Sequence, residues 1–243
     1  MQTLKEKFII HAIESVLGNS DRKQVPRIMD LGCGTAAYVP PMRQKIANFQ
    51  YVGVEPIKTS YEAAEKNLAN VPDTKLHFQL GYDVVPDESE ESFDLVFSLS
   101  ALEHIKQLRR FIALSAKYTK RGGVVMHRYD LGHALTPHSH KERFHVWLGN
   151  TMPSILPERK FVRYVGVPEV EDYYRTAGVE PYDVTYHQMP SHKAFEKVAR
   201  ENGAEAVAEL FQWEMKHQSL IKTLPVSDLE RLFPAVAVWG IKQ

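Results

Sequence analysis

Cysteine is almost absent from this sequence, since Cys33 is the only one among 243 residues. A single thiol cannot form a disulfide within the chain, which is consistent with a reducing compartment. Long apolar stretches are absent too: no run approaches the ~18 residues of a membrane-spanning helix, and residues 1–8 lack the apolar segment of a secretion signal. We therefore expect a cytoplasmic protein without a membrane partner.

The sequence also lacks an excess of either charge, because 30 lysines and arginines balance 30 aspartates and glutamates. Such a chain has no overall positive field to attract a phosphate backbone, so we expect no nucleic-acid partner and favour a small molecule. The hydrophobic share of 44% and the charged share of 25% are ordinary for a globular protein. This composition excludes the disordered, collagen-like and membrane classes.

Short β-prone segments alternate with helical periodicity along the chain. Strands are predicted at residues 27–31, 51–55, 75–80, 94–100, 124–129, 181–188 and 235–241, and helices at residues 4–17, 39–47, 59–69, 105–119 and 169–177, with one or two more within 195–224. Strands that alternate with helices form parallel βαβ units. The pattern therefore predicts the α/β fold class, with an open, mostly parallel sheet of seven strands and helices on both faces.

We expect a single domain over residues 1–243. Within it, residues 1–20 supply an N-terminal helix and residues 25–129 a cofactor-binding core, while residues 130–157 and 190–225 form a cap over the substrate side. The first of these cap segments is predicted to be rich in loops. Loops of this length in compact domains are often lids or binding loops.

A glycine-rich turn follows the first predicted strand, in the run DLGCGT at residues 30–35. Sheets of this kind bind ligands beyond the carboxyl ends of their strands, and glycines let the backbone approach a ligand closely. Gly32, Gly34 and Ala37 also satisfy the dinucleotide fingerprint G-x-G-x-x-A, with Glu55 about 20 residues further on. An NAD-dependent oxidoreductase is therefore one alternative.

The carboxylate of Asp30, just before the glycines, favours a different cofactor. It would repel a pyrophosphate but tolerate the ammonium and sulfonium charges of S-adenosylmethionine. Glu55 ends the second predicted strand, where it can accept hydrogen bonds from both ribose hydroxyls of an adenosine. Together these residues favour S-adenosylmethionine over NAD.

The same residues carry a resemblance to a known family. The run at residues 30–35 and the acid Glu55 resemble the first two motifs of class I, Rossmann-like methyltransferases that depend on S-adenosylmethionine, and residues 92–105 resemble their fourth-strand segment. The resemblance implies that the open, mostly parallel, seven-stranded sheet is Rossmann-like, and that the protein is a methyltransferase with S-adenosyl-L-methionine as its cofactor. By this resemblance, the residues implied to hold the cofactor are Asp30, Gly32, Cys33, Gly34, Glu55, Asp83 at the adenine amino group, and Ser98 at the methionine end.

Residues 228–240 resemble methyltransferases of bacterial polysaccharide clusters, which implies O-methylation of a small molecule or of a sugar or glycan precursor. An alcohol acceptor must lose its proton. Asp130 and His133 follow the fifth predicted strand, and an aspartate bonded to one imidazole nitrogen would raise the basicity of the other. We therefore expect Asp130 and His133 to act as a base or as substrate ligands, with His104 as a third catalytic candidate.

Three alternatives remain open for this half of the site. Asp130 and His133 could instead bind a divalent ion together with His138 or His140, although their spacing is not diagnostic and we expect no metal. Arg143, Trp147 and Arg163 could hold an anionic or sugar-bearing acceptor. Finally, the acceptor could be a macromolecule or an atom other than oxygen.

Overall fold

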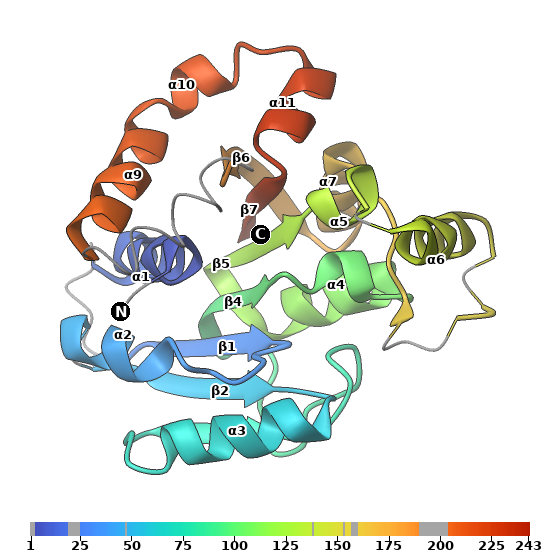
Figure 1. The fold of residues 1–243 in the computed structure, drawn as a ribbon. Helices are drawn as coiled ribbons and strands as arrows, with labels where there is room; N and C mark the ends of the chain where they lie inside the picture. Colours follow the sequence, from blue (N-terminus) through green and yellow to red (C-terminus); the bar gives the residue numbers. More distant parts are fainter. Residues whose placement is uncertain are drawn as a thin grey trace.

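The computed structural model describes residues 3–18, 25–46, 48–137, 139–152, 154–156, 160–189 and 204–243. The strands of these residues form one seven-stranded sheet in the order β3-β2-β1-β4-β5-β7-β6 (Figure 1). They are β1 (Arg27–Leu31), β2 (Gln50–Val54), β3 (Thr74–His77), β4 (Phe93–Leu99), β5 (Thr119–Asp130), β6 (Val179–His187) and β7 (Ala235–Lys242). Strand β7 runs antiparallel to both of its neighbours, and the other pairings are parallel. The predicted fold class is confirmed.

The described helices pack on both faces of this sheet. They are α1 (Leu4–Leu17), α2 (Val39–Lys45), α3 (Lys58–Leu68), α4 (Leu108–Tyr118), α5 (Gly132–Leu135), α6 (His140–Thr151), α7 (Val167–Thr176), α9 (Ala204–Lys216), α10 (Gln218–Ile221) and α11 (Val226–Leu232), with the short 3-10 helix η1 (Leu102–His104). One apolar cluster joins the sheet to α4 and α7, and a second joins the other face to α1, α2 and α3. Within the described ranges, no helix has the length and apolarity that a bilayer crossing requires.

Helix α1 is fixed at its start by a capping box. The amide of Glu6 donates to Thr3 Oγ1 over 3.0 Å, and the amide of Thr3 donates to Glu6 Oε2 over 2.7 Å, so two otherwise unpaired amides are bonded. This start holds Lys5 in the first turn, where its ammonium donates to the carbonyl oxygen of Leu99 over 3.3 Å. The N-terminal helix therefore reaches the carboxyl end of β4.

The segment predicted to be rich in loops contains two helices, so that prediction is wrong for α5 and α6. Helix α6 begins after Ser139, whose hydroxyl accepts from the amide of Glu142 over 3.2 Å. Only Leu148 and Gly149 are buried along this helix. A helix with so small a buried face leaves little apolar periodicity in the sequence, which is why its pattern was not visible.

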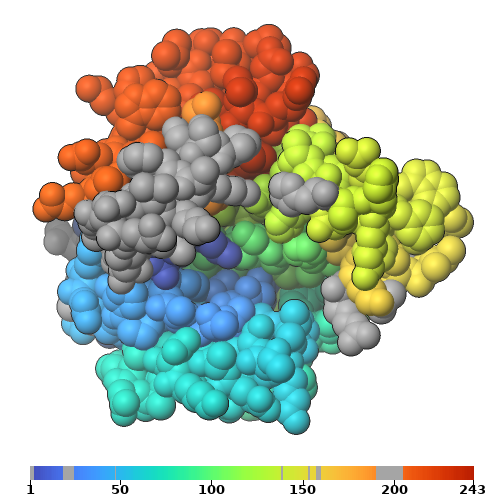
Figure 2. Space-filling model, viewed as in Figure 1, coloured from blue at the N-terminus to red at the C-terminus, as the bar shows by residue number. Residues whose placement is uncertain are grey.

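The predicted helices within residues 195–224 appear as α9 and α10, while residues 190–203 lie outside the described residues. Leu4 of α1 and Val207 of α9 are buried against each other. In the space-filling view, α9 to α11 form the upper surface in orange and red, and α3 the lower one in cyan (Figure 2). In the ribbon view, the carboxyl ends of β1 and β2 lie between α3 and α11 (Figure 1).

Candidate active site

The glycine-rich turn after β1 folds back onto the end of β2. The amides of Gly32 and Cys33 both donate to the carbonyl oxygen of Val54, over 2.7 and 3.0 Å. Gly32 has a φ of +86° and Gly34 a φ of +58°, values in the left-handed region that side chains other than glycine rarely adopt. The turn thus needs both glycines to keep its shape.

Glu55, the residue after β2, closes this turn from the other side. Its carboxylate accepts from the amide of Gly34 through Oε2 and from the amide of Ile57 through Oε1, both over 2.8 Å. The side chain is only 4% exposed, and burial raises its pKa. A carboxylate offers about four acceptor sites, so two remain for the hydroxyls of a ligand.

A cavity of about 410 Å³ opens beside Gly32 and Glu55. Its volume is within the range of small-molecule sites. Its other polar lining residues are Ser100 and His104, and its apolar wall includes Leu80. Ser100 has a φ of +57°, a strained conformation for a residue with a side chain, and such strain is concentrated at functional sites.

Two predicted cofactor residues, Ser98 and Cys33, are buried and are not among the lining residues of this cavity. Ser98 is fully buried, and its hydroxyl lies 2.9 Å from Nδ1 of His127. Burial lowers the pKa of His127 to about 3, so this pair is neutral and structural. Cys33 is 5% exposed, and burial raises the pKa of its thiol. Its backbone shapes the turn while its thiol stays protonated.

Asp83 was predicted to reach the adenine amino group. The structure places its carboxylate at the surface, 45% exposed, where it pairs with Arg110 over 3.4 Å. Two earlier residues of the same turn, Leu80 and Gly81, line the cavity. A Cβ on Gly81 would lie 2.7 Å from the ring of Phe111, so the glycine makes room for that ring of α4 in the cavity wall.

Asp30 is buried at the end of β1, with 1% of its surface exposed. The hydroxyls of Tyr38 and Tyr51 both donate to its Oδ2, the second over 3.2 Å. Burial raises the pKa of Asp30 to about 7, although the bond from Tyr38 and the ammonium of Lys5 act in the opposite direction. Asp30 is therefore partly protonated near neutral pH.

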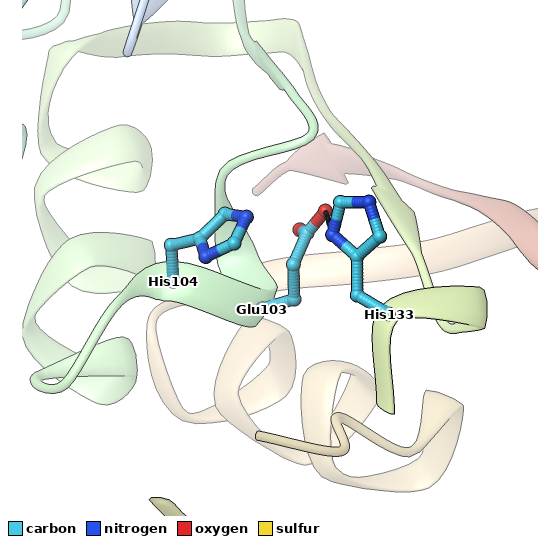
Figure 3. Close-up of side chains that lie close together, drawn as sticks. All are labelled: Glu103, His104 and His133. Atoms are coloured by element: carbon cyan, nitrogen blue, oxygen red, sulfur yellow. Dashed lines mark ion pairs between the residues drawn. The ribbon is translucent and has the colours of Figure 1, made fainter. Parts of the chain in front are cut away.

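A second group of polar side chains lies where β4 and β5 end (Figure 3). Glu103 and His104 belong to η1, just after β4, and His133 belongs to α5, just after β5. Oε1 of Glu103 lies 3.8 Å from Nδ1 of His133, and the rings of the two histidines are 5.6 Å apart between centroids. We call Glu103, His104 and His133 the acid–histidine cluster. His104 belongs both to this cluster and to the cavity lining.

The structure pairs His133 with a different acid from the one that the sequence suggested. Oδ1 of Asp130 accepts from the amide of Gly132 over 2.8 Å and so stabilises the turn that carries His133. The amide of Asp130 donates to Glu103 Oε1 over 3.2 Å. Sequence reasoning did not include Glu103 among the candidate residues, although its position just after a central strand was a usable signal.

The remaining histidine and arginine candidates lie elsewhere. His140 is exposed at the start of α6, and His138 lies outside the described residues. Arg163 forms a two-pronged pair with Glu169, over 2.8 and 3.0 Å, and thereby holds the start of α7. Arg143 and Trp147 line an open hollow of about 670 Å³ next to α5.

Three features together define the class of this fold: an antiparallel β7 between β5 and β6, the glycine turn after β1, and the acid after β2. They are those of the Rossmann-like methyltransferases that use S-adenosylmethionine. The model of the methyltransferase-domain family matches residues 1–209, and the chain belongs to this family. Its cofactor is S-adenosyl-L-methionine. The alternative of an NAD-dependent oxidoreductase is excluded by this membership.

Among curated relatives, the chain is 29% identical over 99 residues to the ubiquinone biosynthesis O-methyltransferase of Bartonella quintana, a match that spans 41% of this chain and 39% of that protein. It is 29% identical over 100 residues to the mitochondrial enzyme of the same name from Mus musculus, across 40% of this chain and 26% of the relative. The matches thus span about two fifths of these relatives or less.

Solved structures share the fold at low identity. A putative sarcosine dimethylglycine methyltransferase from Galdieria sulphuraria matches 98% of this chain and 85% of its own, with a TM-score of 0.64 and 11% identity. Geranyl diphosphate methyltransferase in complex with geranyl diphosphate and sinefungin matches 98% of this chain and 78% of its own, with a TM-score of 0.62 and 11% identity. These likenesses concern the fold alone.

Asp30 should make cofactor binding depend on pH. We expect the positive charges of S-adenosylmethionine to lie near the glycine turn and to favour the carboxylate over the neutral acid, which would link binding to loss of its proton. Because the pKa of Asp30 is about 7, we expect cofactor affinity to rise several-fold from pH ~6 to ~8. Asp30→Asn keeps an oxygen for Tyr38 and Tyr51 and should flatten this profile in calorimetric titrations. An equally steep profile in the variant would contradict this role.

Proposed function

We propose that this enzyme methylates a hydroxyl oxygen of a small molecule that binds between the cofactor cavity and the acid–histidine cluster. The observation that carries the proposal is the position of His104, which lines the cavity and also lies within the cluster. A substrate atom beside the cofactor sulfonium is therefore also close to a buried carboxylate and two imidazoles. Glu55, which also lines the cavity, is the proposed ligand of the ribose hydroxyls.

The chemistry of the cluster favours oxygen as the accepting atom. In the transfer, the bond between sulfur and the methyl carbon breaks while the bond between oxygen and that carbon forms, and the hydroxyl loses its proton. The sulfonium is already a good leaving group, so positioning supplies much of the rate. An alcohol acceptor also needs a group that accepts its proton. A neutral amine acceptor does not need such a group, because its lone pair can attack directly. Glu103, His104 and His133 are groups of that kind.

The relatives support the same class of acceptor. The two enzymes described above are named ubiquinone biosynthesis O-methyltransferases. Beside α5, the hollow lined by Arg143 and Trp147 offers an exposed indole face and a guanidinium. An indole face stacks on sugar or aromatic rings and a guanidinium pairs with phosphate or carboxylate, so a ring-bearing, anionic hydroxyl compound is the first acceptor to test.

A screen for S-adenosylhomocysteine release tests this proposal. The purified enzyme would be incubated with S-adenosylmethionine and, in separate reactions, phosphorylated sugars, nucleotide sugars, hydroxylated aromatic acids and the matching amines. We expect release with a hydroxyl compound and a product whose new methyl group lies on oxygen by NMR. Turnover confined to amines, or a product methylated on nitrogen or carbon, would contradict O-methylation.

A further inference from the structure

We propose that Glu103, His104 and His133 form a binding site for a divalent transition-metal ion. Each residue offers one ligand atom, and the three atoms all lie within 4.8 Å of one another. Figure 3 shows the Glu103 carboxylate between the two imidazole rings. Two imidazoles and one carboxylate form a donor set that suits zinc, iron, cobalt and manganese.

The carboxylate of Glu103 supplies a second, independent indication. Its side chain is only 1% exposed, and Oε1 accepts from the amide of Asp130. Its other oxygen, Oε2, is buried and has no hydrogen-bond partner among the residues that the structure describes. A buried carboxylate oxygen without a partner is costly to keep ionised, and a cation bound at that oxygen would offset the cost.

His104 is held in the manner of a metal ligand. Its Nδ1 lies 3.0 Å from the carbonyl oxygen of Phe161, and because a carbonyl only accepts, Nδ1 must carry the proton and donate. The lone pair of the ring is then on Nε2. Metal-binding histidines commonly have their second nitrogen fixed in this way by a carbonyl or a carboxylate.

The geometry leaves room for an acceptor as a further ligand. The side chain of His133 is 50% exposed, so the third ligand can move and one side of the site is open to solvent. With ligand bonds of about 2.1 Å the donor atoms would have to lie closer together than they do here, and the exposed ring of His133 is the ligand that can move. Three protein ligands with open positions are typical of catalytic metal sites rather than structural ones.

This site would deepen the proposed function, and in that respect it rests on it. A hydroxyl oxygen bound to the ion has a lowered pKa and releases its proton to solvent. The oxygen then takes the methyl group from the sulfonium, and S-adenosylhomocysteine leaves with the electron pair of the broken bond. The set differs from the one considered from the sequence, because Glu103 and His104 take the places of Asp130 and of His138 or His140.

Titration of chelator-treated enzyme with Co²⁺ tests the site directly. We expect a single equivalent to bind, with the visible absorption of cobalt ligated by histidine. Glu103→Gln and His133→Ala should each weaken this binding at least about 10-fold, as loss of a ligand must exceed the 10- to 100-fold effect of losing an outer partner. His140→Ala is the matched control from the same histidine-rich region and should bind as the unaltered enzyme does. Retained S-adenosylmethionine binding shows that each variant is folded.

The outcomes separate the metal from the reaction. Absence of stoichiometric cobalt binding, or binding that neither ligand variant alters, overturns the metal site. Full activity of the chelator-treated enzyme overturns the role of the ion in the reaction. O-methylation by such a metal-free enzyme would leave the proposed function intact. Cobalt binding that depends on Glu103 and His133, in an enzyme that methylates no hydroxyl, would uphold the site and contradict the function.

Discussion

Replacing Glu55 by alanine should weaken S-adenosylmethionine binding about 100-fold. The carboxylate is held by the amides of Gly34 and Ile57 and keeps two acceptor sites for the ribose hydroxyls. A hydrogen bond to a charged group contributes about 1.5–3 kcal/mol, and two such bonds together give at least ~3 kcal/mol, which corresponds to about 100-fold in the dissociation constant. The variant also leaves the amide of Gly34 without its partner, which loosens the turn. Calorimetric titration with the cofactor measures the loss.

Two further variants sharpen this measurement. Glu55→Gln keeps one acceptor oxygen without the charge and should give an intermediate affinity. Asp83→Asn changes another acid that was predicted to contact the cofactor, but its carboxylate pairs with Arg110 at the surface. We expect Asp83→Asn to change the affinity for S-adenosylmethionine little. A loss of affinity comparable to that of Glu55→Ala would place the adenine contact at Asp83. Unchanged affinity in Glu55→Ala would contradict the proposed cofactor site.

The sheet and the glycine turn could be predicted because their signals are local. A strand of buried apolar residues, two glycines and an acid at the next strand end lie within a short stretch of chain. The order of the strands is a different matter, since the insertion of β7 between β5 and β6 depends on pairings between distant segments. The sequence predicted seven strands in a mostly parallel sheet but no order for them.

The acid–histidine cluster shows why the rest of the site could not be predicted from the sequence. Leu99 at the end of β4 is in register with Arg128 near the end of β5, and this pairing brings η1 beside α5. The sequence shows that both segments follow strands, but not that their strands are neighbours in this register. Asp30 is a similar case, because its charge was visible in the sequence while the convergence of Tyr38 and Tyr51 on it was not.

Replacing Glu103 by glutamine should lower the turnover number at least about 100-fold, because groups that move or stabilise a proton contribute about 10²- to 10⁴-fold. The amide is nearly the same size and can still accept from the amide of Asp130, so the fold should be retained. Glu103 lies outside the lining of the cofactor cavity, and the dissociation constant of S-adenosylmethionine should change less than about 2-fold.

The two variants therefore give opposite patterns: Glu55→Ala impairs binding of the cofactor, and Glu103→Gln impairs the transfer of its methyl group. Steady-state rates at saturating cofactor, combined with calorimetric titration of both variants, distinguish these effects. His140→Ala, from an exposed position at the start of α6, should match the unaltered enzyme in both measurements. Full turnover in Glu103→Gln would mean that the acceptor is activated away from the acid–histidine cluster. In that case the chemistry would have to be sought among other charged groups near these strand ends, such as Lys5 and Asp130.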